Sequence, residues 1–248
     1  MRISRALAIV GCLLVGHAAA GGLFWALVNV PESNIAMLAL SVLVAVLLLI
    51  VLSWAETGAL LAWDQGVTLG CAARRGLTSV MPFLAGALVF WFFWWLTARA
   101  DAWHTAYAGE IDAWWMAKTE SARTGWIHSG IAILLWLIRY VIGVSLAVAA
   151  LSAGALRGGR ALVSFAWVRR GLSLRQLGPL GLAIVVLMLL PLQAVYWRPE
   201  SIPPNALEMT LVIARLAAIY VVANAGWALV LHAGARAVSA TSSPPPPS

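Results

Sequence analysis

Residues 130–179 read GIAILLWLIRYVIGVSLAVAALSAGALRGGRALVSFAWVRRGLSLRQLGP. The stretch begins with an apolar run at 131–151, which is long enough to cross a bilayer as a helix, since about 20 apolar residues span the hydrocarbon core. A basic, amphipathic segment follows, with Arg157, Arg160, Arg169, Arg170 and Arg175. Beyond Pro179 the chain is apolar again. This order predicts a membrane span, a turn on the membrane surface and a second span.

The composition of the whole chain agrees with a membrane protein. Of its 248 residues, 62% are hydrophobic and only 10% are charged, whereas soluble domains carry about 25% charged residues. Most of the surface must therefore face lipid. The net charge of +7 does not indicate a nucleic-acid partner, because the basic residues cluster beside apolar spans, where the positive-inside rule accounts for them.

Hydropathy predicts six spans, at 6–28, 35–55, 79–98, 130–152, 179–197 and 209–231. These segments are too long for barrel strands, and backbone groups in lipid must be satisfied within a segment, so we expect helices. The predicted fold class is all-α: a polytopic membrane helical bundle with additional amphipathic helices in the membrane plane. Residues 1–239 form one integral membrane domain, and we expect the Pro-rich tail at 240–248 to be disordered.

The distribution of basic residues predicts the orientation. With a cytoplasmic N-terminus, ten basic residues fall inside: Arg2, Arg5, Arg74, Arg75, Arg157, Arg160, Arg169, Arg170, Arg175 and Arg236. Four fall outside: Arg99, Lys118, Arg123 and Arg198. This bias places both termini in the cytoplasm and the protein in the plasma (cytoplasmic) membrane. Ala18-Ala19-Ala20 would also suit signal-peptide cleavage, but the apolar run continues to Val30, so we expect an uncleaved first span.

Two predicted cytoplasmic turns resemble each other. Gly58-Ala59-Leu60 leads to Arg74-Arg75-Gly76-Leu77, and Gly154-Ala155-Leu156 leads to Arg169-Arg170-Gly171-Leu172. We interpret 35–98 and 130–197 as two copies of one unit; the alternative is chance similarity, since Gly and Leu are abundant. Each turn would form a basic amphipathic helix that attracts anionic lipid, or else a helix packed under the bundle. The loop at 99–129 would form a helix on the outer leaflet.

Arg139 is the most informative single residue, because it lies near the middle of the fourth span, where a charge is costly. In one interpretation, a bound anion or a partner chain compensates the charge of Arg139. In the other, backbone carbonyls, Tyr140 and water satisfy it. Arg215, Tyr220 and Asn224 share the last span and could form a polar seam. His17 and Gln193 fit ordinary interhelical bonds. No acid falls deep in a predicted span, since Glu56 and Asp64 fall at a cytoplasmic end.

Other chemistry has weak support in the sequence. The loop residues Asp101, His104, Glu110, Asp112 and His128 match no metal-ligand spacing, although one helical turn would bring Asp101 near His104. Enzyme and nucleotide motifs are absent. We therefore expect no catalytic residue, no metal and no cofactor.

Two functional hypotheses remain. The first is a non-enzymatic integral protein that acts by packing against lipid, a membrane protein partner or a second copy of itself. The second is a small transporter or exporter of an anionic solute or lipid, with Arg139 and Arg215 in its path. The absence of an acidic residue deep in a predicted span counts against the transporter hypothesis, because proton or sodium coupling commonly uses such a residue.

Overall fold

The computed structural model describes residues 3–31, 34–66, 68–77, 79–121, 123–174, 176–178, 180–184, 187 and 206–239. Over these residues the chain is helical and contains no strand, which confirms the all-α class. The elements are α1 (Ile3–Asn29), α2 (Ile35–Asp64), α3 (Leu69–Leu77), α4 (Val80–Ala106), α5 (Ala108–Thr119), α6 (Gly125–Trp136), the π-helix η1 (Leu137–Ile142), α7 (Gly143–Arg157), α8 (Gly159–Val163), α9 (Ala166–Gly171) and α11 (Ala206–Ser239).

Five helical stretches are long and apolar enough to cross a membrane: Arg5–Asn29, Ile35–Asp64, Val80–Ala106, Gly125–Arg157 and Met209–Arg236. They cover five of the six predicted spans. The remaining one, 179–197, lies mostly outside the described residues, although Leu180 and Ile184 are helical and buried. The predicted tail at 240–248 also lies outside them.

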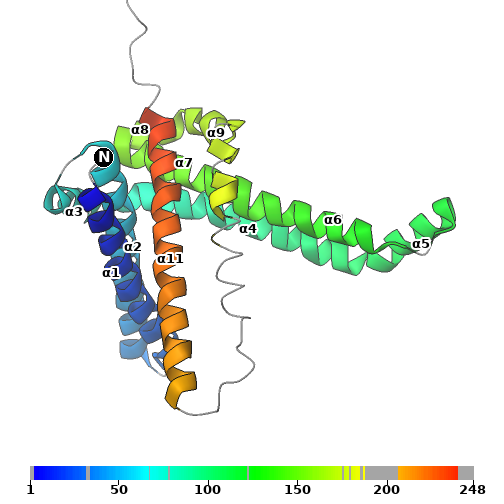
Figure 1. Cartoon of the computed structure of the whole chain (residues 1–248), viewed down its shortest axis with the longest axis horizontal. Helices are drawn as coiled ribbons and strands as arrows, with labels where there is room; N and C mark the ends of the chain where they lie inside the picture. The colour runs from blue at the N-terminus through cyan, green and yellow to red at the C-terminus, as the bar shows by residue number, and fades with distance from the viewer. Residues whose placement is uncertain are drawn as a thin grey trace, which may run out of the picture.

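The long helices form two groups that run across each other (Figure 1). The upright helices are α1, α2 and α11, which pack side by side. The arm consists of α4 packed along α6, η1 and α7, with α5 at its tip. The groups meet near the end of the upright helices that carries the N-terminus. Because transmembrane helices rarely tilt beyond about 40°, one flat bilayer cannot hold both groups upright in this arrangement.

Close approach between helices depends on small residues. A Cβ built on Gly16 of α1 would lie 2.5 Å from the Cβ of Ala55 on α2. A Cβ on Gly86 of α4 would lie 2.9 Å from the carbonyl oxygen of Ala147 on α7. Dispersion contacts rather than hydrophobic transfer hold helices together in lipid, so such small residues let the backbones come close enough to pack.

Two surface turns fold back onto the preceding long helix. Ser53 and Thr57 of α2 donate hydrogen bonds to the carbonyl of Gly76 in α3, at 3.4 and 3.3 Å. In the other turn, Ser145 of α7 donates to the carbonyl of Gly171 in α9, at 2.6 Å. Both Arg-Arg-Gly segments therefore end against a buried hydroxyl. The repeat itself stays a prediction, because most of 179–197 lies outside the described residues.

Two predicted surface elements differ from the structure. The second turn is not one amphipathic helix but two short ones, because Phe165 adopts a left-handed conformation with φ 50° between α8 and α9. The outer loop at 99–129 is not a separate surface helix either. Helix α4 continues to Ala106, and α5 and α6 complete a hairpin, since the apolar and aromatic sequence after residue 98 contains no helix-breaking proline.

Candidate functional site

Arg139 lies in the π-helix η1 and is half-buried against α4. Its Nε donates to the hydroxyl of Thr97 at 2.7 Å. Its guanidinium stands 4.6 Å from the ring centre of Trp94 and 6.0 Å from that of Tyr140. A hydroxyl acceptor and two aromatic faces offset part of the cost of a charge in the membrane. An anion or partner at Arg139 stays a prediction.

The other predicted site residues lie on α11, away from these contacts. Tyr220 donates from its hydroxyl to the carbonyl of Leu14 on α1 at 2.6 Å, and Asn224 donates from Nδ2 to the carbonyl of Tyr220 at 2.9 Å. Arg215 is half-buried further along α11. The structure thus brings Tyr220 and Asn224 together on the upright helices and places Arg139 in the arm, so these four residues do not form one site.

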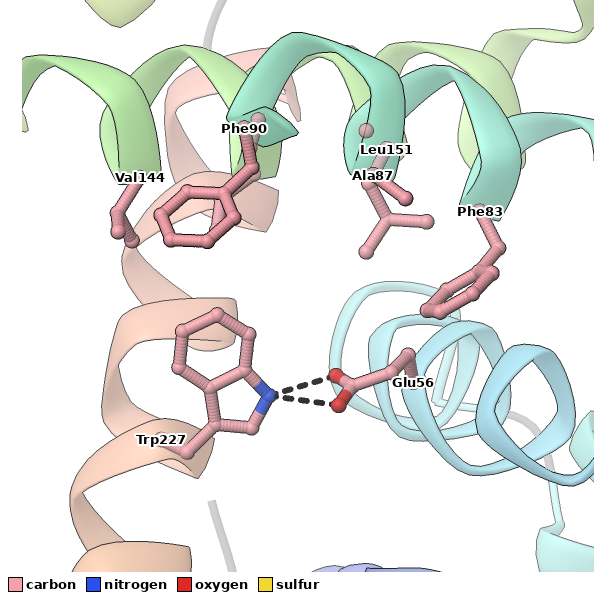
Figure 2. A pocket seen from close by; sticks show the side chains of 10 residues that line it. Glu56, Phe83, Ala87, Phe90, Val144, Leu151 and Trp227 are labelled. Carbon is pink, nitrogen blue, oxygen red and sulfur yellow. Dashed lines mark hydrogen bonds between the residues drawn. The ribbon is translucent and has the colours of Figure 1, made fainter. Parts of the chain in front are cut away.

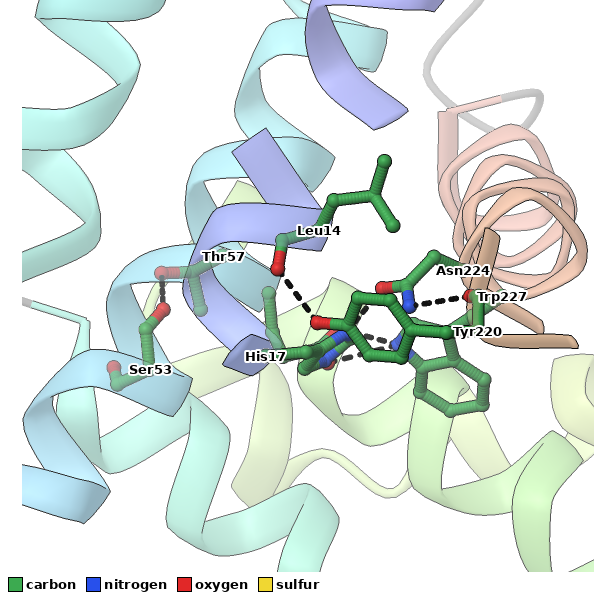
Figure 3. Close-up of polar contacts among 8 residues, drawn as sticks. Leu14, His17, Ser53, Thr57, Tyr220, Asn224 and Trp227 are labelled. Carbon is green, nitrogen blue, oxygen red and sulfur yellow. Dashed lines mark hydrogen bonds and ion pairs between the residues drawn. The ribbon is translucent and has the colours of Figure 1, made fainter. Parts of the chain in front are cut away.

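Asn224 belongs to a buried cluster that joins all three upright helices (Figure 3). His17 of α1 lies with Nε2 2.8 Å from Oε1 of Glu56 on α2, and with Nδ1 2.5 Å from Oδ1 of Asn224 on α11. Trp227 of α11 donates from Nε1 to both carboxylate oxygens of Glu56, at 2.8 and 2.7 Å. Glu56 is only 5% exposed. We call His17, Glu56, Asn224 and Trp227 the polar centre.

The hydrogen bonds of the polar centre determine where its proton can lie. Asn224 donates from Nδ2 to a carbonyl, so its Oδ1 accepts from Nδ1 of His17. His17 Nε2 faces a carboxyl oxygen of Glu56. Two states satisfy every atom: an imidazolium beside a carboxylate, or a neutral imidazole that accepts from a protonated Glu56. These states differ only in the position of one proton between Nε2 of His17 and Oε1 of Glu56.

A cavity of about 280 Å³ opens beside the polar centre, where the arm crosses the upright helices (Figure 2). Among the described residues that line it, Glu56 is the one ionisable group; the others are Phe83, Gly86, Ala87, Phe90, Val144, Ala147, Val148, Leu151 and Trp227. The cavity is therefore an apolar space with one buried carboxyl group on its wall, and ligand sites commonly combine such apolar walls with a few placed polar groups.

The sequence places Glu56 at the cytoplasmic end of a span, whereas the structure buries this acid inside a longer helix. Helix α2 does not end near residue 55 but continues to Asp64, and Glu56 is buried among its last turns. At 1.5 Å per residue, Glu56 lies about 15 Å along the axis from Gly66, and His17 about 18 Å from Arg5. The signal was available: the chain has no strong helix stop between Glu56 and the Gln65-Gly66 pair.

A second hydrogen-bonded group lies at the tip of the arm. His128 of α6 lies with Nδ1 2.9 Å from Nε2 of His104 on α4, and with Nε2 2.8 Å from Oδ1 of Asp112 on α5. The hydrogen bonds from His128 and then from Thr124 lower the pKa of Asp112 below its ordinary value. His104 therefore pairs with His128 rather than with Asp101. Within the described residues, no group of three His, Cys, Asp or Glu is placed to hold a metal ion.

A more polar hollow of about 410 Å³ lies at the end of the upright helices that carries the N-terminus of the chain, where α1 begins and α2 and α11 end. Arg5 donates to the carbonyl of Gly66 across it. His232 lines it and stacks on Trp63 with ring centres 4.6 Å apart, and Arg236 lines it from α11. Cationic groups from both ends of the chain therefore surround one space.

Comparison with known protein families, with curated proteins and with solved structures finds no match to this chain. The polar centre and the cavity beside it are thus the observations from which a function can be inferred.

Proposed function

We propose that this chain is a multi-pass protein of the cytoplasmic membrane, with both termini in the cytoplasm, that binds a small solute between its helices. The binding site is the cavity beside Glu56, and the His17–Glu56 pair takes up or releases one proton during binding. The protein is non-enzymatic and uses no cofactor in this proposal. The observation that carries it is a buried carboxyl group that faces both a histidine and an apolar cavity.

Placing ionisable groups in a membrane costs free energy. A carboxylate or imidazolium at the centre of a span costs about 2.5–3.5 kcal/mol on insertion scales. Well-packed apolar residues often replace a buried ion pair without loss of stability. Packing α1, α2 and α11 therefore does not require Glu56 and His17. Their presence on a cavity wall favours a role in binding or proton transfer over a purely structural one.

This proposal shares its class with the transporter hypothesis from the sequence, but it uses different residues. Arg139 already has Thr97 and Trp94 as partners, and it does not line the cavity. The cavity wall carries a carboxyl group, which disfavours an anionic solute. The objection that coupling needs a deep acid loses its force once Glu56 is buried in α2.

A second candidate function is docking to a membrane protein partner or to a second copy of the chain. The arm extends away from the upright helices (Figure 1). It carries large exposed aromatic side chains. Trp91, Trp103 and Trp126 are 61%, 67% and 61% exposed. Such rings also suit the membrane interface, so mild extraction followed by native mass spectrometry distinguishes a bound protein chain from lipid.

Lipid with anionic headgroups is a further expected partner. Arg5 and Arg236 line the hollow at the proposed cytoplasmic end, and α8 and α9 carry Arg160, Arg169 and Arg170 close to the exposed Phe165. Basic residues beside apolar ones favour the headgroup region of an anionic leaflet. The same native mass spectra would show whether anionic lipid is retained.

The proton-transfer part is tested by infrared titration of the purified full chain. The carbonyl stretch of protonated carboxyl groups should change with pH in the wild type, and the part of this change that comes from Glu56 should be missing in Glu56→Gln. Glu110→Gln, at an exposed position, is the matched control and should keep that part. The proposal fails if Glu56→Gln gives the same titration difference as the control.

A further inference from the structure

We propose that the solute bound in this cavity is a hydrophobic organic cation: a small ammonium compound with an aromatic or branched alkyl body. Its charge would lie at Glu56, and its body would fill the space that α4 and α7 line opposite Glu56 and Trp227. This inference rests on the proposed function and names the chemical class of its ligand.

The carboxylate of Glu56 can accept more hydrogen bonds than it receives. A carboxylate offers about four lone-pair positions. Oε1 lies within hydrogen-bond distance of His17 and Trp227, whereas Oε2 receives one bond from the described part of the chain, that from Trp227. The carboxylate thus has unused acceptor capacity, and its residue lines the cavity. Figure 2 shows the carboxyl group of Glu56 close to the indole nitrogen of Trp227 and below the side chains of α4.

The second step concerns the charged groups on every element that packs against α2. From α1, His17 contacts Glu56 directly. From α11, Tyr220 directs its hydroxyl to a carbonyl of α1. On α3, Arg74 and Arg75 are exposed, and Arg75 donates to Gln65. The cavity-lining residues of α4 and α7 are all uncharged. Among these described groups, His17 is the one cation that contacts the carboxylate.

The third step concerns the body of the ligand. Aromatic rings from α4 and α11 surround the space: Phe83, Phe90 and Trp227. Aromatic faces attract cations, most strongly where water is excluded, and they also bury apolar surface. An anion would meet a carboxylate and no positive lining residue, and a neutral compound would gain nothing from the charge. A carboxylate combined with aromatic walls therefore selects a cation with an apolar body.

Charge balance links binding to proton release. The His17–Glu56 pair holds one shared proton, either as N–H on His17 or as O–H on Glu56. A cation beside the carboxylate repels that proton electrostatically, so the N–H or O–H bond breaks and the proton leaves to bulk solvent. One positive charge enters as one leaves, and the pair remains as a neutral imidazole and a carboxylate. The cation and the proton therefore compete for one site.

The test uses the full chain in lipid nanodiscs and three probes of similar size. Phenyltrimethylammonium is the cation, benzyl alcohol the neutral compound and benzenesulfonate the anion. Calorimetry should give the cation an affinity about tenfold or more above that of benzyl alcohol, with no binding of the anion. Measurements in buffers of different ionisation enthalpy should give one proton released per cation, and affinity for the cation should fall as the pH is lowered.

Variants test the contribution of the Glu56 charge and that of the cavity space separately. Glu56→Gln should reduce cation affinity to that of benzyl alcohol and leave benzyl alcohol binding unchanged. His17→Gln should keep cation binding and abolish proton release. If either variant fails to fold, Ala87→Phe provides an independent check, because it fills the cavity from α4 and leaves every side chain of the polar centre in the sequence. Ala87→Phe should abolish binding of both the cation and benzyl alcohol.

The outcomes distinguish a failure of the cationic ligand class from a failure of the proposed solute-binding function. If benzyl alcohol binds, Ala87→Phe blocks it, and the cation binds no better, the cavity is a ligand site but the cationic class is wrong. Preferential binding of benzenesulfonate would likewise overturn the cationic class. If a folded wild-type protein binds none of the probes, both the inference and the solute-binding function fail.

Discussion

The indole Nε1 of Trp227 lies 2.8 Å and 2.7 Å from the two carboxylate oxygens of Glu56, so one donor on α11 holds a buried acid on α2. This contact attaches the last described helix to α2. It also fixes the carboxyl group with one face toward His17 and another toward the cavity.

The first prediction concerns that donor. Trp227→Phe keeps an aromatic ring in the cavity wall but leaves the Glu56 carboxyl without one of its donors. A buried polar group that loses a partner costs about 1–3 kcal/mol. We expect unfolding of the variant at lower denaturant concentration by about that free energy. Trp91→Phe, at an exposed position on α4, is the control and should change stability little. Equal losses in both variants would contradict the role of the hydrogen bond.

The second prediction concerns the approach of α1 to α2. Gly16→Ala places a methyl group 2.5 Å from the Cβ of Ala55, so the helices must separate. Overpacking of this kind costs about 1–3 kcal/mol, and it should also lengthen the His17–Glu56 contact. Gly11→Ala on the same helix meets nothing within 4 Å, so it should stabilise α1 slightly through helix propensity. Thermal unfolding in detergent compares the two, and similar shifts would argue against close packing at Gly16.

The third prediction concerns the acceptor of Arg139. Thr97→Val keeps the shape of the side chain but removes the hydroxyl that accepts from Nε. Interhelical hydrogen bonds in membranes contribute about 1 kcal/mol, so we expect a loss of that size in unfolding free energy. In the double variant Thr97→Val/Arg139→Leu, much of the loss should be recovered, because no guanidinium remains to be satisfied. Additive losses would mean that the two side chains are not coupled.

The fourth prediction concerns acid stability at the tip of the arm. Hydrogen bonds from His128 and Thr124 lower the pKa of Asp112 from its ordinary 3.8. A lowered pKa in the folded state means that this contribution to stability is complete above pH 3.8 and is lost as the pH falls through the lowered value. The difference in tryptophan fluorescence between the wild type and Trp114→Phe/Trp115→Phe should therefore report a loosening of the tip at strongly acidic pH. Asp112→Asn should remove this acid transition, and its persistence would assign the transition to another group.

The fifth prediction concerns how the arm lies in the membrane. With both termini cytoplasmic, the crosswise arrangement places the arm along the cytoplasmic face, so a membrane-impermeant thiol reagent should label Ser121→Cys from the cytoplasmic side in a chain with Cys12 and Cys71 replaced. Labelling from the outside would mean that the arm stands upright, which would take α4 and α7 away from Glu56 and contradict the cavity. A reporter fused after Ser248 checks the termini separately, and an outside signal there would contradict the proposed orientation.

Helix positions could be predicted well from the sequence, because hydropathy is a local property and lipid leaves little choice of secondary structure. The apolar runs that contain Ile9, Val44 and Arg139 all lie within helices. Asn224 and Tyr220 could be identified as a polar pair because they share one helix face, four residues apart.

Contacts between distant segments could not be predicted in this way. Glu56 follows an apolar run and reads as the polar end of a span, and only the docking of α1 and α11 makes it a buried residue. His104 has an acid three residues before it, yet its partner is His128 on the returning helix. The close packing of α4 along α7 within the arm depends on Gly86 and Gly154, which no hydropathy window records.

The polar centre also implies an order of events during biosynthesis. His17 and Glu56 are 39 positions apart, so they can meet once α2 has been made. Their donors and acceptors on α11 are far later in the chain: Asn224 lies 207 positions from His17, and Trp227 lies 171 positions from Glu56. Contacts of such separation form late. Throughout translation of the intervening segments, the nascent chain therefore carries an incompletely bonded acid in the bilayer. Arrival of the final helix completes this set of bonds, and a chain truncated before it would display to membrane quality control the kind of unsatisfied polar group that marks an unfinished protein.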